Sequence, residues 1–181
     1  MPMEMKEMIA RTFARMVSEK GMDNVTVKSL VEACHISRQT FYYHFQDLMD
    51  VIEWAMDQTL HQMLEEALVN QKPEEALQIF VEFAVKNREL LKKMLDSQRR
   101  EQIEGMLFAT ARKYLQGLLE TATPRLPVNY SDMDLLLDFW AGGFTGVLLQ
   151  QCRKKQVNAK KLTDQIQRIL TQWMLGAGQE K

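Results

Sequence analysis

The residues whose types and spacing suggest chemistry lie in a short segment that follows Ser37. The side chains there can recognise nucleic acid: arginine grips guanine through two parallel hydrogen bonds, glutamine pairs with adenine, and threonine offers a hydroxyl or a methyl group. The set consists of Arg38, Gln39, Thr40, Tyr43 and His44. We predict that they read a DNA groove, with Tyr43 and His44 either contacting phosphates or packing at the surface.

A helix–turn–helix would place these side chains. Thr26 is a suitable N-cap for a helix over residues 27–34, and Ser37 is a suitable N-cap for a second helix over residues 38–44. The second helix of such a pair enters the major groove while the first crosses the backbone. Phe41 and Phe45, four residues apart, would form its buried side. The predicted DNA-binding residues also include the two caps, Thr26 and Ser37, and Lys28, which is either a phosphate contact or an ordinary surface lysine.

The stretch from Thr26 to Phe45, TVKSLVEACHISRQTFYYHF, resembles the DNA-binding domain of TetR-family transcriptional regulators. The residues that match the family pattern I-A-x-x-A-G-V-S-x-G-x-x-Y-x-H-F are Ile36, Ser37, Tyr42, His44 and Phe45, with Leu30 and Val31 at its first two positions. The resemblance implies a homodimer that binds a palindromic double-stranded DNA operator. Within this motif Tyr42 is expected to be a core or helix-packing aromatic residue, and the alternative is a DNA contact.

Three residues depart from that pattern. His35 and Gln39 stand where the family usually has glycine. Histidine tolerates a left-handed backbone better than most residues, so we expect the turn to be kept. Leu48 stands where many members place a phosphate-binding lysine. This removes one expected phosphate contact. The backbone N–H groups at that helix start could still bind a phosphate, although Asp47 would oppose it, and the alternative is that Leu48 packs against the first helix.

The rest of the chain also shows helical periodicity and no strand alternation, so the predicted fold class is all-α. We predict a three-helix DNA-binding domain over residues 1–46 and a helical effector-sensing and dimerisation domain over residues 47–181. The expected helices cover residues 4–20, 27–34, 38–44, 48–69, 73–87, 88–95, 99–122, 131–153 and 158–175.

The helix expected over residues 131–153 contains three glycines, Gly142, Gly143 and Gly146. Each costs about 1 kcal/mol relative to alanine within a helix, so the set indicates close helix packing, within the subunit or across a two-fold axis. By resemblance, the last two helices pair with their symmetry mates. The predicted dimer interface consists of Trp140, Gly143, Gly146, Val147, Ile166, Ile169 and Trp173.

The middle helices would sense an effector, and their apolar residues form either a cavity or ordinary core. The candidate pocket residues are Phe80, Phe83, Met94, Met106, Phe108, Tyr114 and Phe139. The arrangement of the C-terminal helices resembles the branch of regulators associated with dihydroxyacetone kinase operons, which implies a kinase-like protein coactivator as an alternative to a small molecule. A helical interaction module with a degenerate DNA reader is the third alternative.

Composition excludes several other classes. The chain has 181 residues, 23 Lys and Arg against 24 Asp and Glu, and a net charge of −1, so any DNA must be bound by a small placed patch. The two cysteines make neither a disulfide framework nor a zinc spacing. No catalytic or metal-ligating constellation is present and no cofactor is expected. No membrane span or signal peptide is expected, so the predicted location is the cytoplasm.

Overall fold

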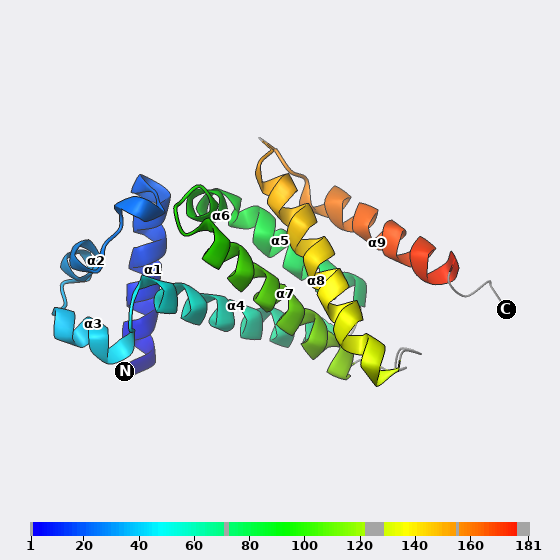
Figure 1. Ribbon diagram of the computed structural model, residues 1–181, viewed down its shortest axis with the longest axis horizontal. Coiled ribbons are helices and arrows are strands. Elements are labelled where there is room, and N and C mark those ends of the chain that lie inside the picture. Colours follow the sequence, from blue (N-terminus) through cyan, green and yellow to red (C-terminus); the bar gives the residue numbers. More distant parts are fainter. Residues whose placement is uncertain (1, 71–72, 122–128, 155, 177–181) are drawn as a thin grey trace.

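The computed structural model describes residues 2–70, 73–121, 129–154 and 156–176, and within these ranges it contains helices and no β-strand, as predicted (Figure 1). The helices are α1 (Pro2–Lys20), the 3₁₀ turn η1 (Met22–Asn24), α2 (Val27–Cys34), α3 (Arg38–His44), α4 (Leu48–Asn70), α5 (Pro73–Lys86), α6 (Arg88–Leu95), α7 (Arg100–Thr121), α8 (Tyr130–Cys152) and α9 (Ala159–Gly176). None of these described helices combines the length and apolar character needed to cross a bilayer.

The three N-terminal helices gather at one end of the molecule, and α4 leads from them along the bundle formed by the later helices (Figure 1). The long helix α4 packs against α1 at its start and against α5 and α7 further along. Helix α8 packs mainly on α7, while α9 lies along α5. As a result, α4 is shared by the N-terminal unit and the C-terminal bundle.

Side-chain caps fix the starts of α2, α3 and α4 where the sequence predicts them. Asp47 begins α4, because its Oδ1 accepts hydrogen bonds from the backbone N–H groups of Met49 at 2.7 Å and Asp50 at 3.0 Å. The expected start of α8 at Ser131 is wrong by one residue. Asn129 is the N-cap instead, with its side chain accepting from the N–H of Asp132 at 3.0 Å.

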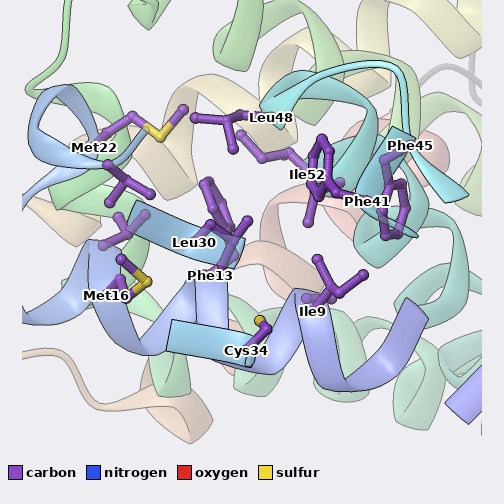
Figure 2. Packing of buried hydrophobic residues seen from close by; sticks show 14 of the residues in the cluster. Ile9, Phe13, Met16, Met22, Leu30, Cys34, Phe41, Phe45, Leu48 and Ile52 are labelled. Carbon is purple, nitrogen blue, oxygen red and sulfur yellow. The ribbon is translucent and has the colours of Figure 1, made fainter. Parts of the chain in front are cut away.

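One hydrophobic cluster holds the N-terminal unit together (Figure 2). It contains α1 residues such as Ile9 and Phe13 and both buried aromatic side chains of the α3 segment. The cluster does not stop at residue 46: Ile52 of α4, Met94 of α6 and Ile103 of α7 also belong to it. The α6–α7 corner is therefore part of the core that supports the helix–turn–helix.

A smaller cluster forms where α4, α5 and α7 meet around Tyr114. The buried Tyr114 ring stacks on Phe80 with centroids 5.3 Å apart, and its hydroxyl donates a hydrogen bond of 2.7 Å to the carbonyl oxygen of Ala76. Burial, with the nearby charge of Glu66 in second place, raises the pKa of Tyr114 well above its usual value. The hydroxyl therefore stays protonated and remains a donor.

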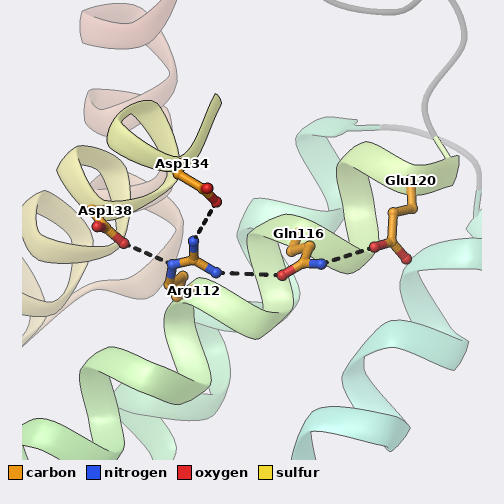
Figure 3. Close-up of polar contacts among 5 residues, drawn as sticks. All are labelled: Arg112, Gln116, Glu120, Asp134 and Asp138. Atoms are coloured by element: carbon orange, nitrogen blue, oxygen red, sulfur yellow. Dashed lines mark hydrogen bonds and ion pairs between the residues drawn. The ribbon is translucent and has the colours of Figure 1, made fainter. Parts of the chain in front are cut away.

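Polar contacts orient α8 on α7 (Figure 3). Arg112 of α7 donates from Nε to Asp138 at 2.7 Å and from Nη2 to Asp134 at 2.8 Å, both on α8. The same guanidinium contacts Gln116, which in turn donates to Glu120. Because Asp134 and Asp138 are one turn apart, this fork joins one side of α8 to α7, next to the side buried through Leu137, Ala141 and Phe144.

Replacing Tyr114 with phenylalanine should reduce the free energy of unfolding by about 1 kcal/mol, because the carbonyl of Ala76 loses a buried donor. Urea denaturation monitored by circular dichroism measures the change. Tyr43→Phe is the matched control, since that side chain is exposed, and its effect should stay within about 0.5 kcal/mol. Equal stability of Tyr114→Phe and the wild type would contradict the assigned hydrogen bond.

Candidate DNA-binding interface

The turn between α2 and α3 is built around His35. This residue adopts the left-handed conformation, with φ 55° and ψ 40°, at the position where the family usually has glycine. Its N–H donates to the carbonyl of Glu32 at 3.2 Å, and the N–H of Ile36 donates to the carbonyl of Val31 at 3.1 Å. The expectation that histidine keeps the turn is confirmed.

Ser37 starts α3 as predicted. Its Oγ accepts a hydrogen bond from the N–H of Thr40 at 2.9 Å, and the Ser37 and Thr40 hydroxyls lie 2.8 Å apart. Each hydroxyl therefore already has a partner inside the protein. Of the predicted reading residues, Arg38 and Gln39 are exposed and form no hydrogen bond or ion pair with any part of the chain that the structure describes. These two side chains are available to a ligand.

The faces of α3 are sharply divided. Phe41 and Phe45, four residues apart, are almost completely buried and contact each other with ring centroids at 6.0 Å. The opposite face carries Arg38, Gln39 and Tyr43, and Tyr43 is 82% exposed. His44 is half-buried and packs edge-on against Tyr43 at 5.0 Å. The exposed face thus presents cationic, amide and phenolic donors side by side.

The expectation that Tyr42 is a core residue is wrong. Tyr42 is 57% exposed and meets Phe41 only edge-on, with centroids 5.4 Å apart. The reason is helical geometry: Tyr42 follows Arg38 by four residues and therefore shares its face. We call Arg38, Gln39, Tyr42 and Tyr43 the reading face of α3.

Helix α2 precedes α3 in the motif, and its own residues cap its start. The hydroxyl of Thr26 accepts from the N–H of Ser29 at 3.1 Å, and the hydroxyl of Ser29 accepts from the N–H of Thr26 at 3.1 Å. In this reciprocal capping box the Thr26 hydroxyl already accepts a hydrogen bond from the backbone of its own helix start. Lys28 in the first turn of α2 is exposed.

The start of α4 does not offer a phosphate site. Leu48 is only 4% exposed and points into the N-terminal cluster (Figure 2), so the packing alternative holds. The N–H groups that could meet a phosphate there are occupied, because Asp47 accepts from Met49 and Asp50, and Asp50 accepts from Gln46 at 2.8 Å. Both carboxylates would also repel a phosphate.

Lys6 is a cation near this interface that the sequence analysis did not single out. Its Nζ lies 5.0 Å from the centroid of the Phe45 ring and 6.0 Å from that of Trp54. The two rings contact each other edge-on. This cation–π contact ties the start of α1 to the end of α3. No sequence signal relates a lysine in α1 to rings about 40 residues further along the chain.

The structure does not gather the seven candidate effector residues around one cavity. Phe80 and Tyr114 stack on each other, whereas Met94 belongs to the N-terminal cluster and Met106 packs against that cluster. Phe108 is half-buried and Phe83 is 36% exposed. The assignment of Phe139 to a pocket is wrong, because this side chain is 68% exposed on α8.

Two clefts lie elsewhere on the described part of the chain. None of the seven candidate effector residues contributes to the lining of either cleft. The first lies between η1 and the start of α7, with a volume of about 520 Å³ and a mainly polar lining that includes Asp23 and Arg99. The second lies near the end of α4 beside Val69 and Ile79. In the described part of the chain, no group of three or more His, Cys, Asp or Glu residues could hold a metal ion.

The residues predicted for the dimer interface have different environments. Gly143, Gly146, Val147 and Ile169 are exposed in the single chain. Trp140 is half-buried against Phe144, and Ile166 is buried among α5, α8 and α9, so Ile166 is core rather than interface. The side chain of Trp173 lies outside the described residues. Two exposed apolar residues of α8, Leu135 and Phe139, were not assigned to the interface.

A capped helix–turn–helix with a donor-rich outer face, followed by a larger helical domain, defines the class of helix–turn–helix transcription regulators. The family model for bacterial regulatory proteins of the tetR family matches residues 11–48, and the model for a transcriptional regulator C-terminal region matches residues 71–172. The chain belongs to the TetR family of transcriptional regulators, and it is a DNA-binding transcription factor rather than an enzyme.

Solved structures share this fold at low sequence identity. The dihydroxyacetone kinase operon activator DhaS superposes with a TM-score of 0.73 and 14% identity, covering 93% of this chain and 95% of DhaS. A TetR-family regulator from Syntrophomonas wolfei gives 0.62 and 15%, covering 92% of each chain. A regulator of the TerR/AcrR family from Aquifex aeolicus gives 0.57 and 21%, covering 92% of this chain and 98% of that one. No curated protein sequence matches the chain.

Placing lysine at position 48 should destabilise the protein by about 1–3 kcal/mol, because the substitution puts an ammonium group where Leu48 is buried. DNA affinity at a temperature where the variant is folded should not increase. Thermal melting and DNA titration measure the two effects, with Leu48→Met as the volume-matched control. A variant that melts like the wild type and binds DNA more tightly would restore the phosphate-contact alternative.

Proposed function

We propose that this protein is a sequence-specific transcriptional regulator that binds a palindromic operator as a homodimer. The observation that carries the proposal is the reading face of α3, where Arg38 and Gln39 are exposed and make no polar contact with the described chain. Arginine and glutamine in the first turn of a recognition helix can discriminate guanine and adenine in the major groove. A two-fold axis would supply two such faces to two half-sites.

The charge distribution favours recognition by a few placed contacts. The chain is close to neutral, and the start of α4 carries two carboxylates instead of a cation. Lys28 of α2, and the hydroxyls of Tyr42 and Tyr43 on the reading face itself, are exposed groups that can meet phosphates. Each half-site would then neutralise few phosphates, so affinity should depend only moderately on salt.

We propose that an effector acts on the C-terminal domain and reaches the reading face through packed helices. Leu48 and Ile52 of α4 belong to the N-terminal cluster, while Leu60 and Met63 of the same helix pack around Tyr114. A shift of α4 would therefore change the support of α3 and the spacing of the two reading faces. No observation on the chain favours a kinase-like coactivator over a small molecule.

The operator can be found by selection from random duplex DNA, followed by titration of the enriched sequence. We expect enrichment of an inverted repeat whose half-sites are separated by about one helical turn or a multiple of it. Enrichment of no sequence above the starting pool would refute sequence-specific binding. Enrichment of a single unrepeated half-site would refute the dimeric mode while keeping the reading face.

Arg38→Ala should weaken binding to the selected operator by about 1–3 kcal/mol and relax discrimination at one base pair, since a bidentate contact to a guanine would be lost. The melting temperature should not change, because Arg38 has no polar partner in the described residues. Arg99→Ala is the matched control, because this arginine is also exposed and has no side-chain polar partner in the described residues. Undiminished affinity of Arg38→Ala would remove this residue from the interface.

Lys28→Ala should behave differently, because a phosphate contact carries no base information. Affinity should fall by a similar factor on operator and random duplexes, and the slope of log affinity against log salt should become shallower by about one unit per subunit. Titrations at several salt concentrations measure the slope. An unchanged slope would identify Lys28 as an ordinary surface lysine.

A further inference from the structure

The cleft between η1 and the start of α7 lies where the N-terminal unit meets the α6–α7 corner. Its volume of about 520 Å³ is in the range of small-molecule sites, which occur preferentially where two units meet. One wall comes from the N-terminal unit and the other from the α6–α7 corner. Met22, Asp23 and Val25 belong to the first wall, and Arg99, Glu101 and Gln102 belong to the second.

The base of this cleft is packed into the core. Met22 and Val25 are almost completely buried in the N-terminal cluster, and Ile103 of α7 belongs to the same cluster. The carboxylate of Asp23 accepts hydrogen bonds from the backbone N–H of Gln98 at 3.2 and 3.3 Å, and this contact joins the two walls. The cleft is therefore already formed in the free protein, which lowers the cost of binding a ligand there.

The polar side chains around the cleft are not used by the protein itself. Arg99, Glu101 and Gln102 are exposed, and their side chains form no hydrogen bond or ion pair with the described part of the chain. The carboxylate of Asp23 has a neutral backbone N–H as its partner there, so its charge is not compensated. One guanidinium and two carboxylates thus line the cleft and are available to a ligand.

These three charges select a class of ligand. A guanidinium binds a carboxylate through two parallel hydrogen bonds, and a carboxylate binds an ammonium group. A simple anion would be repelled by the two carboxylates, and a simple cation would be repelled by Arg99. An α-amino acid with a cationic side chain carries one carboxylate and two cations, so its charges are the complement of those that line the cleft.

We propose that this cleft binds an α-amino acid with a cationic side chain, its carboxylate on Arg99 and its two cations beside Asp23 and Glu101. The proposal rests on the effector control proposed above and gives that effector a place and a chemical class. A ligand in the cleft contacts η1 and α7 at once, so it stabilises the α6–α7 corner against the N-terminal unit. It therefore changes operator affinity, and the operator changes ligand affinity by the same factor.

Calorimetric titration of the full-length protein with L-lysine and L-arginine tests the site in the absence of DNA. We expect a dissociation constant of about 1 mM or lower for at least one of them. Norleucine, which lacks the side-chain cation, should bind at least about tenfold more weakly. Glutamate should not bind, because its second carboxylate would meet Asp23 and Glu101. Binding of neither basic amino acid would overturn the site, and equal binding of norleucine or glutamate would overturn the ligand class.

Two variants test the assigned contacts. Glu101→Gln removes one charge with little change of shape, and Arg99→Ala removes the carboxylate partner, so each should raise the dissociation constant of the basic amino acid at least about tenfold. Glu53→Gln on α4 is the matched control, because this exposed carboxylate lies outside the cleft. Unchanged binding by either cleft variant would overturn the contact assigned to that residue.

Titration of the selected operator with and without the basic amino acid tests the control. We expect operator affinity to change at least about fivefold. A ligand that binds in the cleft and leaves operator affinity unchanged would overturn its role as an effector. Failure of the amino acids to bind would leave the reading face and its operator in place. Absence of any operator would refute the proposed function, while the calorimetric result without DNA would stand by itself.

Discussion

The reading face of this protein depends on the burial of Phe41 and Phe45. A helix of seven residues is too short to be stable by its own hydrogen bonds. Helix α3 persists because these two rings are buried in the N-terminal cluster, where Phe45 also meets Trp54 of α4. Their burial also fixes the rotation of α3, so the directions of Arg38 and Gln39 follow from two residues that cannot themselves touch a ligand. Packing inside the domain thus determines the direction of side chains at its surface.

The two parts of the chain are less separate than a division near residue 46 suggests. Met94 and Ile103 are buried in the N-terminal cluster, and the carboxylate of Asp23 accepts from the N–H of Gln98 at 3.2 and 3.3 Å. The corner between α6 and α7 is therefore held to the DNA-binding unit by both apolar and polar contacts. Any rearrangement of the C-terminal bundle that moves this corner must strain the support of α1 or release it.

Much of the fold could be predicted from the sequence because its signals are local. Thr26, Ser37 and Asp47 are caps whose effect reaches only three residues, and the family motif identifies the helix–turn–helix directly. Asn129 and Ser131 are both good capping types, and only the backbone decides between them. The errors at Tyr42 and Phe139 have a different cause: an apolar or aromatic residue at helical spacing is compatible with core, cavity and exposed interface, and the choice depends on helices far away in sequence. The placement of Leu48 was open for the same reason.

The capped helix starts around the motif affect how the protein binds DNA. Thr26 with Ser29, Ser37 with Thr40, and Asp47 with the start of α4 satisfy their backbone donors from within the free protein. These helix starts are therefore already ordered in the free protein, before it binds DNA. Association needs no coupled folding, so its heat capacity change should reflect only the surface buried at the groove. Its rate should be governed by electrostatic steering and by the chance of a correct orientation.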